Sequence, residues 1–504
     1  MKNPNIKLQD VDSGNLSPDI PVEDIEDIAD TPNLRSPQVM EQTGKFNYGE
    51  ALQKNFLFYE ANQSGELSPN NRIAWREDST TEDGLLQGVD LEGGYFDAGD
   101  HVKFGQPMAA SINMLALGGI EYRDAYERSG QYDELLETVK HATDYFLKAH
   151  EIEDGQTSKL WVQVGEGGSA HDHGYWGSPE TVAQSTTRNA FYISSDSPGS
   201  DIAASTAASF ALASEMFRGV DDVYADELLK NAKILFEFAE THQGSYSDSV
   251  SQASPYYTSW SGYNDDLAFG AAALAKVTGE SGYLTKAENY IKNQGGVFDW
   301  TWAADDQSYG AVVILAQLSE DPYFKSQATG WLDRWVNREG AVQDTTGGNE
   351  GLAWRNNWAS VPLAGSTAFL AELYSDTVEY NQSYSDFATG QVDYILGDNP
   401  AGFSYMIGFG DNYAQRPHHR GSAGSQGLND GMTPNDYILH GAIVGGPSEA
   451  NDYAHNDVRN DWISNEVGVS YNAPVAGALI QQYDNFGGDP LSDSELDLLT
   501  GIEI

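Results

Sequence analysis

Apolar residues recur with the period of an α-helix in twelve separate segments of the chain. Several segments begin with side chains that cap helix N-termini, such as Ser200-Asp201 before Ile202 and Asp221-Asp222 before Val223. Most of the segments follow one another in pairs with short connections. The predicted helices span 46–62, 107–128, 133–150, 201–217, 222–241, 263–278, 282–293, 307–318, 321–337, 357–375, 380–396 and 466–484.

Three long stretches interrupt this helical pattern, at 63–106, 151–199 and 397–465. They are rich in Gly, Asp, Asn and aromatic residues, and we find no strand-like alternation repeated over many segments. The simplest architecture is therefore all-α, with six helical hairpins arranged as an (α/α)6 barrel. Loops this long in a compact domain usually carry function, so we expect the chemistry there.

The two ends of the chain differ from the middle. Residues 1–45 are acidic and rich in Pro, Ser and Asn, which is typical of a tail or linker, and 488–504 are predicted to form an acidic C-terminal tail. Residues 46–487 form the predicted helical domain. No stretch approaches the ~18 apolar residues that span a bilayer, and the first residues lack an apolar signal region. If the protein is exported, we expect its signal to be missing from this chain.

The net charge of the chain excludes several classes of binding partner. The chain of 504 residues has 27 Lys and Arg against 76 Asp and Glu, a net charge of −49, so nucleic acid and anionic membranes are improbable partners. Zero cysteines exclude disulfides, thiol catalysis and Cys-ligated zinc. We expect a surface adapted to brine, where the Debye length shrinks to about 3 Å at 1 M salt. An ordinary acidic secreted protein is the alternative, and a fold retained at low salt would favour it.

Two carboxylates lie three residues apart in the segment Gly93–Phe104, at Asp97 and Asp100. A Gly-bearing turn lets both side chains point at one small volume, where they can hold and deprotonate a water molecule. Taken alone, such a pair is more often a solvated loop or an Asx turn. Glycoside hydrolysis would need a partner, a carboxylic acid kept protonated across a cleft.

Glu466 is the candidate partner, at the entry of the predicted helix 466–484. Without context, a Glu in a first helical turn is more often a favourable partner of the helix dipole.

At this point the sequence resembles the glycoside hydrolase family 9 cellulases over about residues 46–485. The resemblance begins with Tyr48–Leu52 and Asn71–Arg76, and it includes the Asp97–Phe104 stretch. Pro417-His418-His419-Arg420 fits the family's His-x-Arg signature. Asp457, Trp462, Glu466 and Asn472-Ala473 have the spacing of its second signature.

The resemblance implies an inverting mechanism on an (α/α)6 barrel. Asp100 would be the general base, with Asp97 orienting the same water, and Glu466 the general acid whose pKa is raised by apolar burial or nearby anions. Asp457 would have a supporting role. The implied sugar-binding residues are His173, Tyr257, Trp260, Trp300, Trp358, His418, Arg420 and Tyr471. Core packing is the alternative for any single aromatic, and a surface patch or a metal site for the His-His-Arg cluster.

A calcium site is also implied by the resemblance. Its ligands would come from Ser261, Gly262, Asp265, Asp266 and Asp305, because backbone and carboxylate oxygens are the hard ligands that Ca²⁺ prefers. The family usually has Glu where Asp266 stands, and the shorter side chain puts bidentate coordination in question. An Asx-rich helix cap is the alternative.

Three further departures from the family pattern leave the carboxylates untouched. After Trp358, the segment 359–363 lacks the family's Arg and Tyr, so a substrate contact is either missing or supplied from elsewhere, with Trp354 or Arg355 as candidates. The second signature has His455 where an aromatic is usual and Gly468 where Ser, Thr or Ala is usual.

The sequence therefore predicts an inverting endo-β-1,4-glucanase, monomeric, adapted to high salt and free of organic cofactors. We expect it to act outside the cell, since its insoluble polymer substrate cannot enter. The first alternative is a catalytically silent protein that binds β-glucan, against which the three retained carboxyls argue. The second is a structural acidic protein, which would bind no cello-oligosaccharide.

Overall fold

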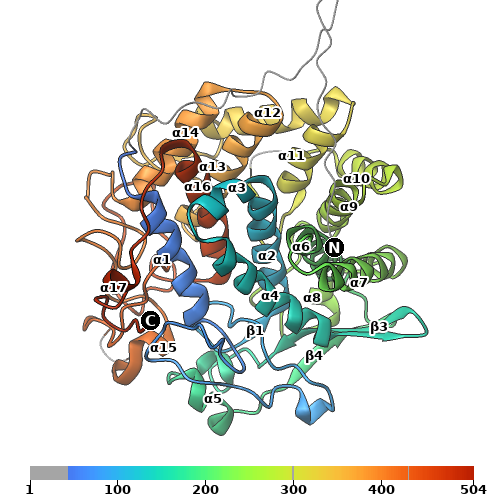
Figure 1. The fold of residues 1–504 in the computed structure, drawn as a ribbon, viewed down its shortest axis with the longest axis horizontal. Helices are drawn as coiled ribbons and strands as arrows, with labels where there is room; N and C mark the ends of the chain where they lie inside the picture. The colour runs from blue at the N-terminus through green and yellow to red at the C-terminus, as the bar shows by residue number, and fades with distance from the viewer. Residues whose placement is uncertain (1–43, 298–299, 429–430) are drawn as a thin grey trace, which may run out of the picture.

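The computed structural model describes residues 44–297, 300–428 and 431–504 (Figure 1). The predicted N-terminal tail 1–45 therefore lies outside the described residues, apart from its last two. Each of the twelve predicted helices is present, with ends that differ by a few residues. They are α1 (Tyr48–Ala61), α2 (Gly105–Glu121), α4 (Tyr132–Ala149), α6 (Ser200–Phe217), α7 (Asp222–Thr241), α9 (Asn264–Thr278), α10 (Ser281–Gln294), α11 (Ser308–Leu318), α12 (Pro322–Val336), α13 (Ser360–Thr377), α14 (Gln382–Leu396) and α16 (Val469–Phe486).

The helices form two concentric rings. The inner ring runs α2, α6, α9, α11, α13, α16, each contacting the next, and α16 closes the ring against α2 (Figure 1). The outer helices α1, α4, α7, α10, α12 and α14 pack against them. This is the predicted (α/α)6 barrel.

The burial of each helix follows its sequence. The inner helix α6 is buried over almost its whole length and is rich in alanine, which lets neighbouring backbones approach closely. The outer helix α4 has apolar side chains on one face and charged ones on the other. A helix that is apolar all round belongs in the interior, whereas an amphipathic one covers it.

The long loops of the helical barrel also contain a few strands, which the sequence pattern did not predict. A four-stranded antiparallel sheet pairs β3 (Gln156–Val164) with β1 (Lys103–Phe104), β2 (His150–Glu153) and β4 (Ala190–Ile193) (Figure 1). Lys103 lies opposite Val164, so the sheet joins the Asp97–Asp100 loop, which leads into β1, to the loop that follows β3. A smaller pair consists of β5 (Gln343–Asp344) and β6 (Ala353–Trp354).

Shorter helices accompany the twelve predicted ones, and some of them lie in the long loops. They are α3 (Arg123–Arg128), which continues the predicted segment 107–128 after a break at Tyr122, α5 (Pro179–Ser185), α8 (Tyr246–Ser249), α15 (Arg420–Ala423) and α17 (Asp493–Leu496), with 3₁₀ turns at Leu85–Gln87, Asp172–Gly174 and Gly424–Gln426.

The segment 488–504 packs against the domain, although its acidic composition predicted a tail. Leu496 is buried, and the Gln53 side chain of α1 exchanges two hydrogen bonds with the backbone of Leu491. Ile502 pairs with Ile73 in an isolated bridge. The segment 488–504 therefore packs on α1. This helix belongs to the outer ring and is nevertheless almost completely buried.

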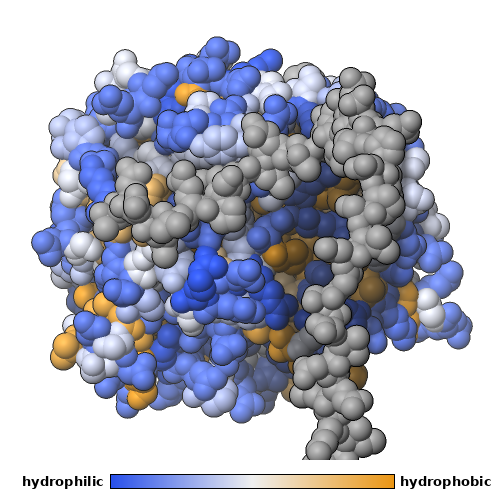
Figure 2. Space-filling model, turned by 45° about the horizontal axis from the view of Figure 1, so that its top comes forward, coloured by the Kyte–Doolittle hydropathy of each residue, from blue (hydrophilic) through white to orange (hydrophobic). Residues whose placement is uncertain are grey.

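The outer surface is largely polar. On the face seen in Figure 2 the described residues are mostly hydrophilic, with smaller apolar patches between them. Among the described residues, no helix combines the length and the apolar character that a bilayer crossing requires.

Candidate active site

The loop carrying Asp97 and Asp100 is held against the segment that carries His418 and Arg420. The Arg420 amide donates to the Gly99 carbonyl at 2.8 Å. A Cβ atom on Gly99 would lie 1.9 Å from the His418 carbonyl oxygen, so only glycine fits between the two aspartates. Two of the predicted motifs, far apart in sequence, thus lie in direct contact.

Asp97 is a buried carboxyl with one open oxygen. Its Oδ2 accepts a hydrogen bond from the Tyr257 hydroxyl at 2.5 Å, whereas Oδ1 is buried and has no hydrogen-bond partner. Burial raises the pKa of Asp97 well above its usual value, and the charges of Asp100 and Glu466 raise it further.

Asp100 has the opposite electrostatic character. Burial by itself would raise its pKa, but a 2.6 Å hydrogen bond from His173 Nδ1 and the charges of His173 and Arg420 outweigh burial, so the pKa lies below the usual value. His173 was predicted as a sugar-binding residue, and the structure makes it a direct partner of Asp100. The pKa values of the two aspartates are therefore shifted in opposite directions, although the residues are three positions apart.

Glu466 lies just before helix α16, not in its first turn as the pattern predicted, because α16 begins at Val469. Its Oε2 accepts hydrogen bonds from Trp358 Nε1 at 2.9 Å and from the Tyr471 hydroxyl at 3.2 Å. Burial raises the pKa of Glu466 to about 7, although these two donors and Arg420 act against the rise. The carboxyl is therefore about half protonated at neutral pH and mostly protonated below it.

The chain brings Glu466 to the aspartates by a backbone contact. The Val469 amide, at the start of α16, donates to the Asp97 carbonyl at 2.8 Å. The charge of Glu466 accordingly contributes to the raised pKa of Asp97, and that of Asp100 to the raised pKa of Glu466. The three predicted carboxyls are therefore close enough for their charges to shift one another's pKa values.

Arg420 and His418 border this unit. The Arg420 guanidinium lies 4.8 Å from the Trp176 ring centre and donates to the His173 carbonyl at 2.6 Å, whereas its buried Nε has no hydrogen-bond partner. Burial lowers the pKa of His418 to about 4, and Arg420 lowers it further, so the imidazole is neutral. Its Nδ1 is 2.7 Å from the Arg459 carbonyl oxygen, which makes Nδ1 the protonated nitrogen.

Asp457 supports the backbone around both signatures. Its carboxylate accepts hydrogen bonds from the amides of Gln415 and Arg416 at 3.0 Å each, and from the Asn465 side chain at 3.2 Å. Asn465 precedes Glu466 in the chain, and its carbonyl accepts from the His418 amide at 2.8 Å. Asp457 thus connects the segment that precedes His418 to the segment that precedes Glu466.

Comparison with known proteins gives the same assignment as the geometry. Residues 48–479 match the model of glycosyl hydrolase family 9. This chain belongs to that family. It is 42% identical over 462 residues to Endoglucanase B of Cellulomonas fimi, covering 89% of this chain and 43% of that relative. It is 41% identical over 455 residues to Endoglucanase A of Bacillus pumilus, covering 88% of this chain and 68% of that relative.

Solved structures agree with the sequence relatives. An endoglucanase from the termite Nasutitermes takasagoensis has a TM-score of 0.81 at 38% identity, covering 87% of this chain and 99% of that one. Endoglucanase CelQ from Clostridium thermocellum, complexed with cellobiose and cellotriose, has a TM-score of 0.79 at 35% identity, covering 89% and 72% of the two chains. The predicted family and fold are confirmed, and the chain is an inverting glycoside hydrolase of the endoglucanase type.

The aromatic residues of this family 9 enzyme are unequally exposed. Trp260 is 75% exposed and Trp358 42%, so both offer ring faces to a ligand. Trp300 is only partly exposed, and the Arg355 guanidinium lies 5.0 Å from its ring centre. Trp354 donates its indole N–H to the Pro447 carbonyl. Of the two predicted replacements for the family Arg, only Arg355 therefore lies against a predicted sugar-binding residue.

Two aromatic residues beside the carboxyls were missed from the sequence. Trp176 contacts both His418, at 5.0 Å between ring centres, and Arg420. Tyr256 packs 4.7 Å from the His173 ring. Trp176 lies in the same aromatic stretch as His173, which was the available signal, whereas nothing separated Tyr256 from its neighbour Tyr257.

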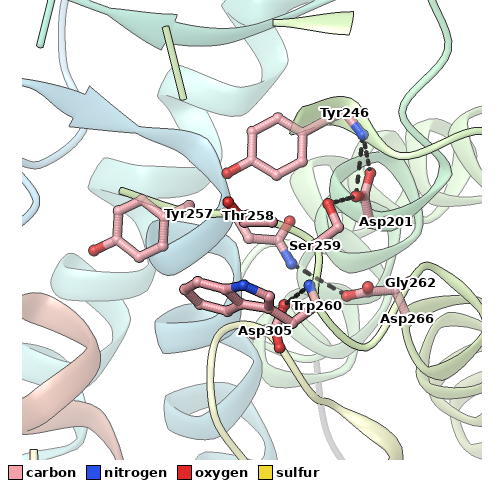
Figure 3. Close-up of a pocket in the computed structure, with 10 residues that line it drawn as sticks. Asp201, Tyr246, Tyr257, Thr258, Ser259, Trp260, Gly262, Asp266 and Asp305 are labelled. Carbon is pink, nitrogen blue, oxygen red and sulfur yellow. Dashed lines mark hydrogen bonds between the residues drawn. The ribbon is translucent and has the colours of Figure 1, made fainter. Parts of the chain in front are cut away.

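Three of the residues predicted to bind calcium line a pocket together with Tyr257 and Trp260 (Figure 3), namely Gly262, Asp266 and Asp305. The Ser261 hydroxyl donates to the Asp305 carbonyl at 2.5 Å and to Asp265 Oδ2 at 3.2 Å. Asp201, which was predicted only as a helix cap, lines the same pocket as Asp266 and Asp305. Burial raises the pKa of Asp201 to about 6 and that of Asp305 to about 7.

The predicted calcium residues offer oxygen atoms, which suit a hard cation. Only some of these oxygens belong to carboxylates. Asp265 Oδ1 and Asp266 Oδ2 are buried without hydrogen-bond partners, as open oxygen ligands would be. However, no group of three or more acidic or His side chains in the described parts of the chain is arranged to hold a metal ion. Any bound cation would depend on backbone and hydroxyl oxygens as well.

Proposed function

We propose that this enzyme hydrolyses internal β-1,4-glucosidic bonds of cellulose or related β-glucans. The observation that supports this most is that the pKa of Asp100 is lowered while the pKa of Glu466 is raised. His173 and Arg420 keep Asp100 ionised, and burial keeps Glu466 protonated near neutral pH, its pKa being about 7. One base and one acid are what inversion requires.

In the proposed reaction Asp100 takes a proton from a water molecule while the water oxygen attacks the anomeric carbon. Asp97 presents its open Oδ1 to the same water, and Tyr257 fixes the other oxygen of that carboxyl. Glu466 gives its proton to the glycosidic oxygen as the bond to the anomeric carbon breaks. One product ends in an α-configured hemiacetal, and the other gains a hydroxyl at its new non-reducing end.

Sugar binding is assigned to the groups around the carboxyls. Trp260 and Trp358 have the exposed ring faces that stack on glucose rings. The neutral His418 can accept a hydrogen bond from a ring hydroxyl through Nε2, and the charged Arg420 can donate one. Trp358 would also hold Glu466, because its indole N–H donates to that carboxyl. Complexes of CelQ with cellobiose and cellotriose support a cello-oligosaccharide as ligand.

Product analysis tests the proposal directly. Cellopentaose is incubated with the wild-type protein, and the anomeric protons are followed by NMR before mutarotation is complete. We expect the α-anomer first, and no hydrolysis by Asp100→Asn or Glu466→Gln. First appearance of the β-anomer, or an Asp100→Asn variant with the wild-type rate, would overturn the mechanism. Binding without any release of reducing ends would instead identify a silent glucan-binding protein.

We further propose calcium as a structural ion at the cluster of Ser261, Gly262, Asp265, Asp266 and Asp305. The open oxygens of Asp265 and Asp266 support this. Asp266 would act as a ligand through Oδ2 alone, because its Oδ1 already accepts hydrogen bonds from Gln106 and Gln307. The ion would neutralise carboxylates that burial otherwise disfavours. Calorimetric titration of chelator-treated protein with Ca²⁺, compared with Asp265→Asn, tests the site.

We also propose that the enzyme works in concentrated salt and outside the cell. A net charge of −49 destabilises a compact state by self-repulsion, and salt screens that repulsion. Thermal unfolding measured from 0.05 to 3 M NaCl tests the first part, with a midpoint that rises with salt as the expected result. An unchanged midpoint would leave an ordinary acidic enzyme.

A further inference from the structure

A buried network of four charged side chains lies behind the Asp100–His173 pair. Asp83, Lys103, Asp172 and Arg188 are each no more than 6% exposed, and their charges sum to zero. Arg188 is at the centre. Its Nε and NH2 donate to the two carboxylate oxygens of Asp83 at 2.9 Å each, and its NH1 donates to Asp172 Oδ1 at 3.0 Å.

Arg188 also contacts the backbone of the loop that carries Asp100. Its NH1 donates to the His101 carbonyl at 2.5 Å, one residue after Asp100. Lys103, two residues further on, reaches Asp83 at 2.8 Å and donates to the Leu91 carbonyl at 2.6 Å. The buried network therefore holds the backbone directly after Asp100, at His101, and it also joins Lys103 to the Leu91 carbonyl before the loop.

The other side of the network fixes His173. Asp172, which accepts from Arg188, also accepts from the Glu166 amide at 2.8 Å and from the Thr186 hydroxyl at 2.6 Å. Asp172 and His173 share the short 3₁₀ turn Asp172–Gly174, so the position of one determines that of the other. Arg188 is thus the common partner of the loops that carry Asp100 and His173.

We propose that Arg188 is a positioning residue for the base of the reaction. It touches neither Asp100 nor the cleft carboxyls, and it acts by holding the two loops at the separation that allows the His173–Asp100 hydrogen bond. This inference rests on the proposed role of Asp100. Loss of the bidentate fork would lengthen that hydrogen bond, and Asp100 would lose the contact that keeps it ionised.

The test compares Arg188→Lys and Thr186→Val with the wild-type protein on cellopentaose. Lys keeps the buried charge but replaces the fork with a single ammonium, and Val removes one hydrogen bond to Asp172 at nearly constant volume. We expect kcat to fall by about tenfold or more in Arg188→Lys, with KM within about twofold, since small misplacement of a reacting group is costly. The acid limb of the kcat/KM profile should move to higher pH, and less so in Thr186→Val.

Arg338→Lys is the matched control. Arg338 is a buried Arg paired with Asp344, and its guanidinium also bonds backbone carbonyls, but it contacts none of the cleft carboxyls. Its variant should lower the unfolding temperature without moving the acid limb. A wild-type acid limb in both Arg188→Lys and Thr186→Val would overturn the inference, and Thr186→Val decides alone if Arg188→Lys does not fold. An active Asp100→Asn would instead overturn the proposed function itself.

Discussion

Replacing Glu466 by Gln is expected to stabilise the fold as pH rises. Burial raises the pKa of Glu466 to about 7, against 4.5 for the free side chain, so the folded state holds this proton more tightly than the unfolded state. The stability that such a group contributes is fully present below its unfolded pKa and is lost as the pH rises through its folded pKa. Gln cannot ionise, so the variant does not lose this stability as the pH rises.

The size of the effect follows from the two pKa values. A difference of about 2.5 pKa units corresponds to about 3 kcal/mol at pH 8, at 1.36 kcal/mol per unit. At pH 5, where only the unfolded form is ionised, it is about 1 kcal/mol. The stability gained by Glu466→Gln should therefore grow by about 2 kcal/mol between pH 5 and pH 8.

Urea unfolding of the wild-type and variant proteins at the two pH values, at one fixed salt concentration, measures this difference. Reversibility must be shown first, because large proteins often unfold irreversibly. Asp457→Asn is a useful comparison, since Asp457 is a hydrogen-bonded carboxylate with Arg416 as ion partner and its loss should destabilise the fold. A Glu466→Gln variant with the same advantage, or none, at both pH values would refute a raised pKa for Glu466.

Three further predictions concern the same site. Trp358→Phe removes a donor that lowers the pKa of Glu466, so the alkaline limb of kcat/KM should move to higher pH, by about one unit or less; an unmoved limb would show that the hydrogen bond is absent in solution. His173→Ala removes the partner that keeps Asp100 ionised, so the acid limb should move to higher pH and kcat should fall; a profile unchanged below neutral pH would contradict this. Gly99→Ala forces a Cβ into the His418 carbonyl, and we expect activity lost at least 100-fold, measured beside circular dichroism to separate a local effect from unfolding.

The helices could be predicted because their signal is local. In α4 the apolar residues repeat along one face, and in α7 the cap residue Asp221 marks the start, whereas the expected cap Asp201 of α6 lies inside its first turn. The sheet could not be predicted in the same way. The buried end of β3 from Leu160 to Val164 shows no alternation of exposed and buried positions, and β1 is only two residues long. Such strands are specified by their partners across the sheet rather than by their own pattern.

The site was predictable in its residue types and less so in its contacts. The spacing of Asp97 and Asp100 marked them as a pair, but nothing in sequence showed that His173 would bond one of them and Tyr257 the other. These bonds depend on tertiary contacts between loops, and so do the opposite pKa directions of the two aspartates. The exact start of α16, which leaves Glu466 outside the helix, depends on the same packing.

The closure of the inner ring by α16 against α2 has a consequence for how the protein is made. The loop carrying Asp97 lies just before α2, and Glu466 lies just before α16, so the two sides of the cleft come from the first and last members of the ring. During synthesis five inner helices leave the ribosome before the one that completes the circle. A nascent chain that ends before Glu466 has both aspartates of the site but neither Glu466 nor α16, so the three carboxyls come together only when the ring is whole.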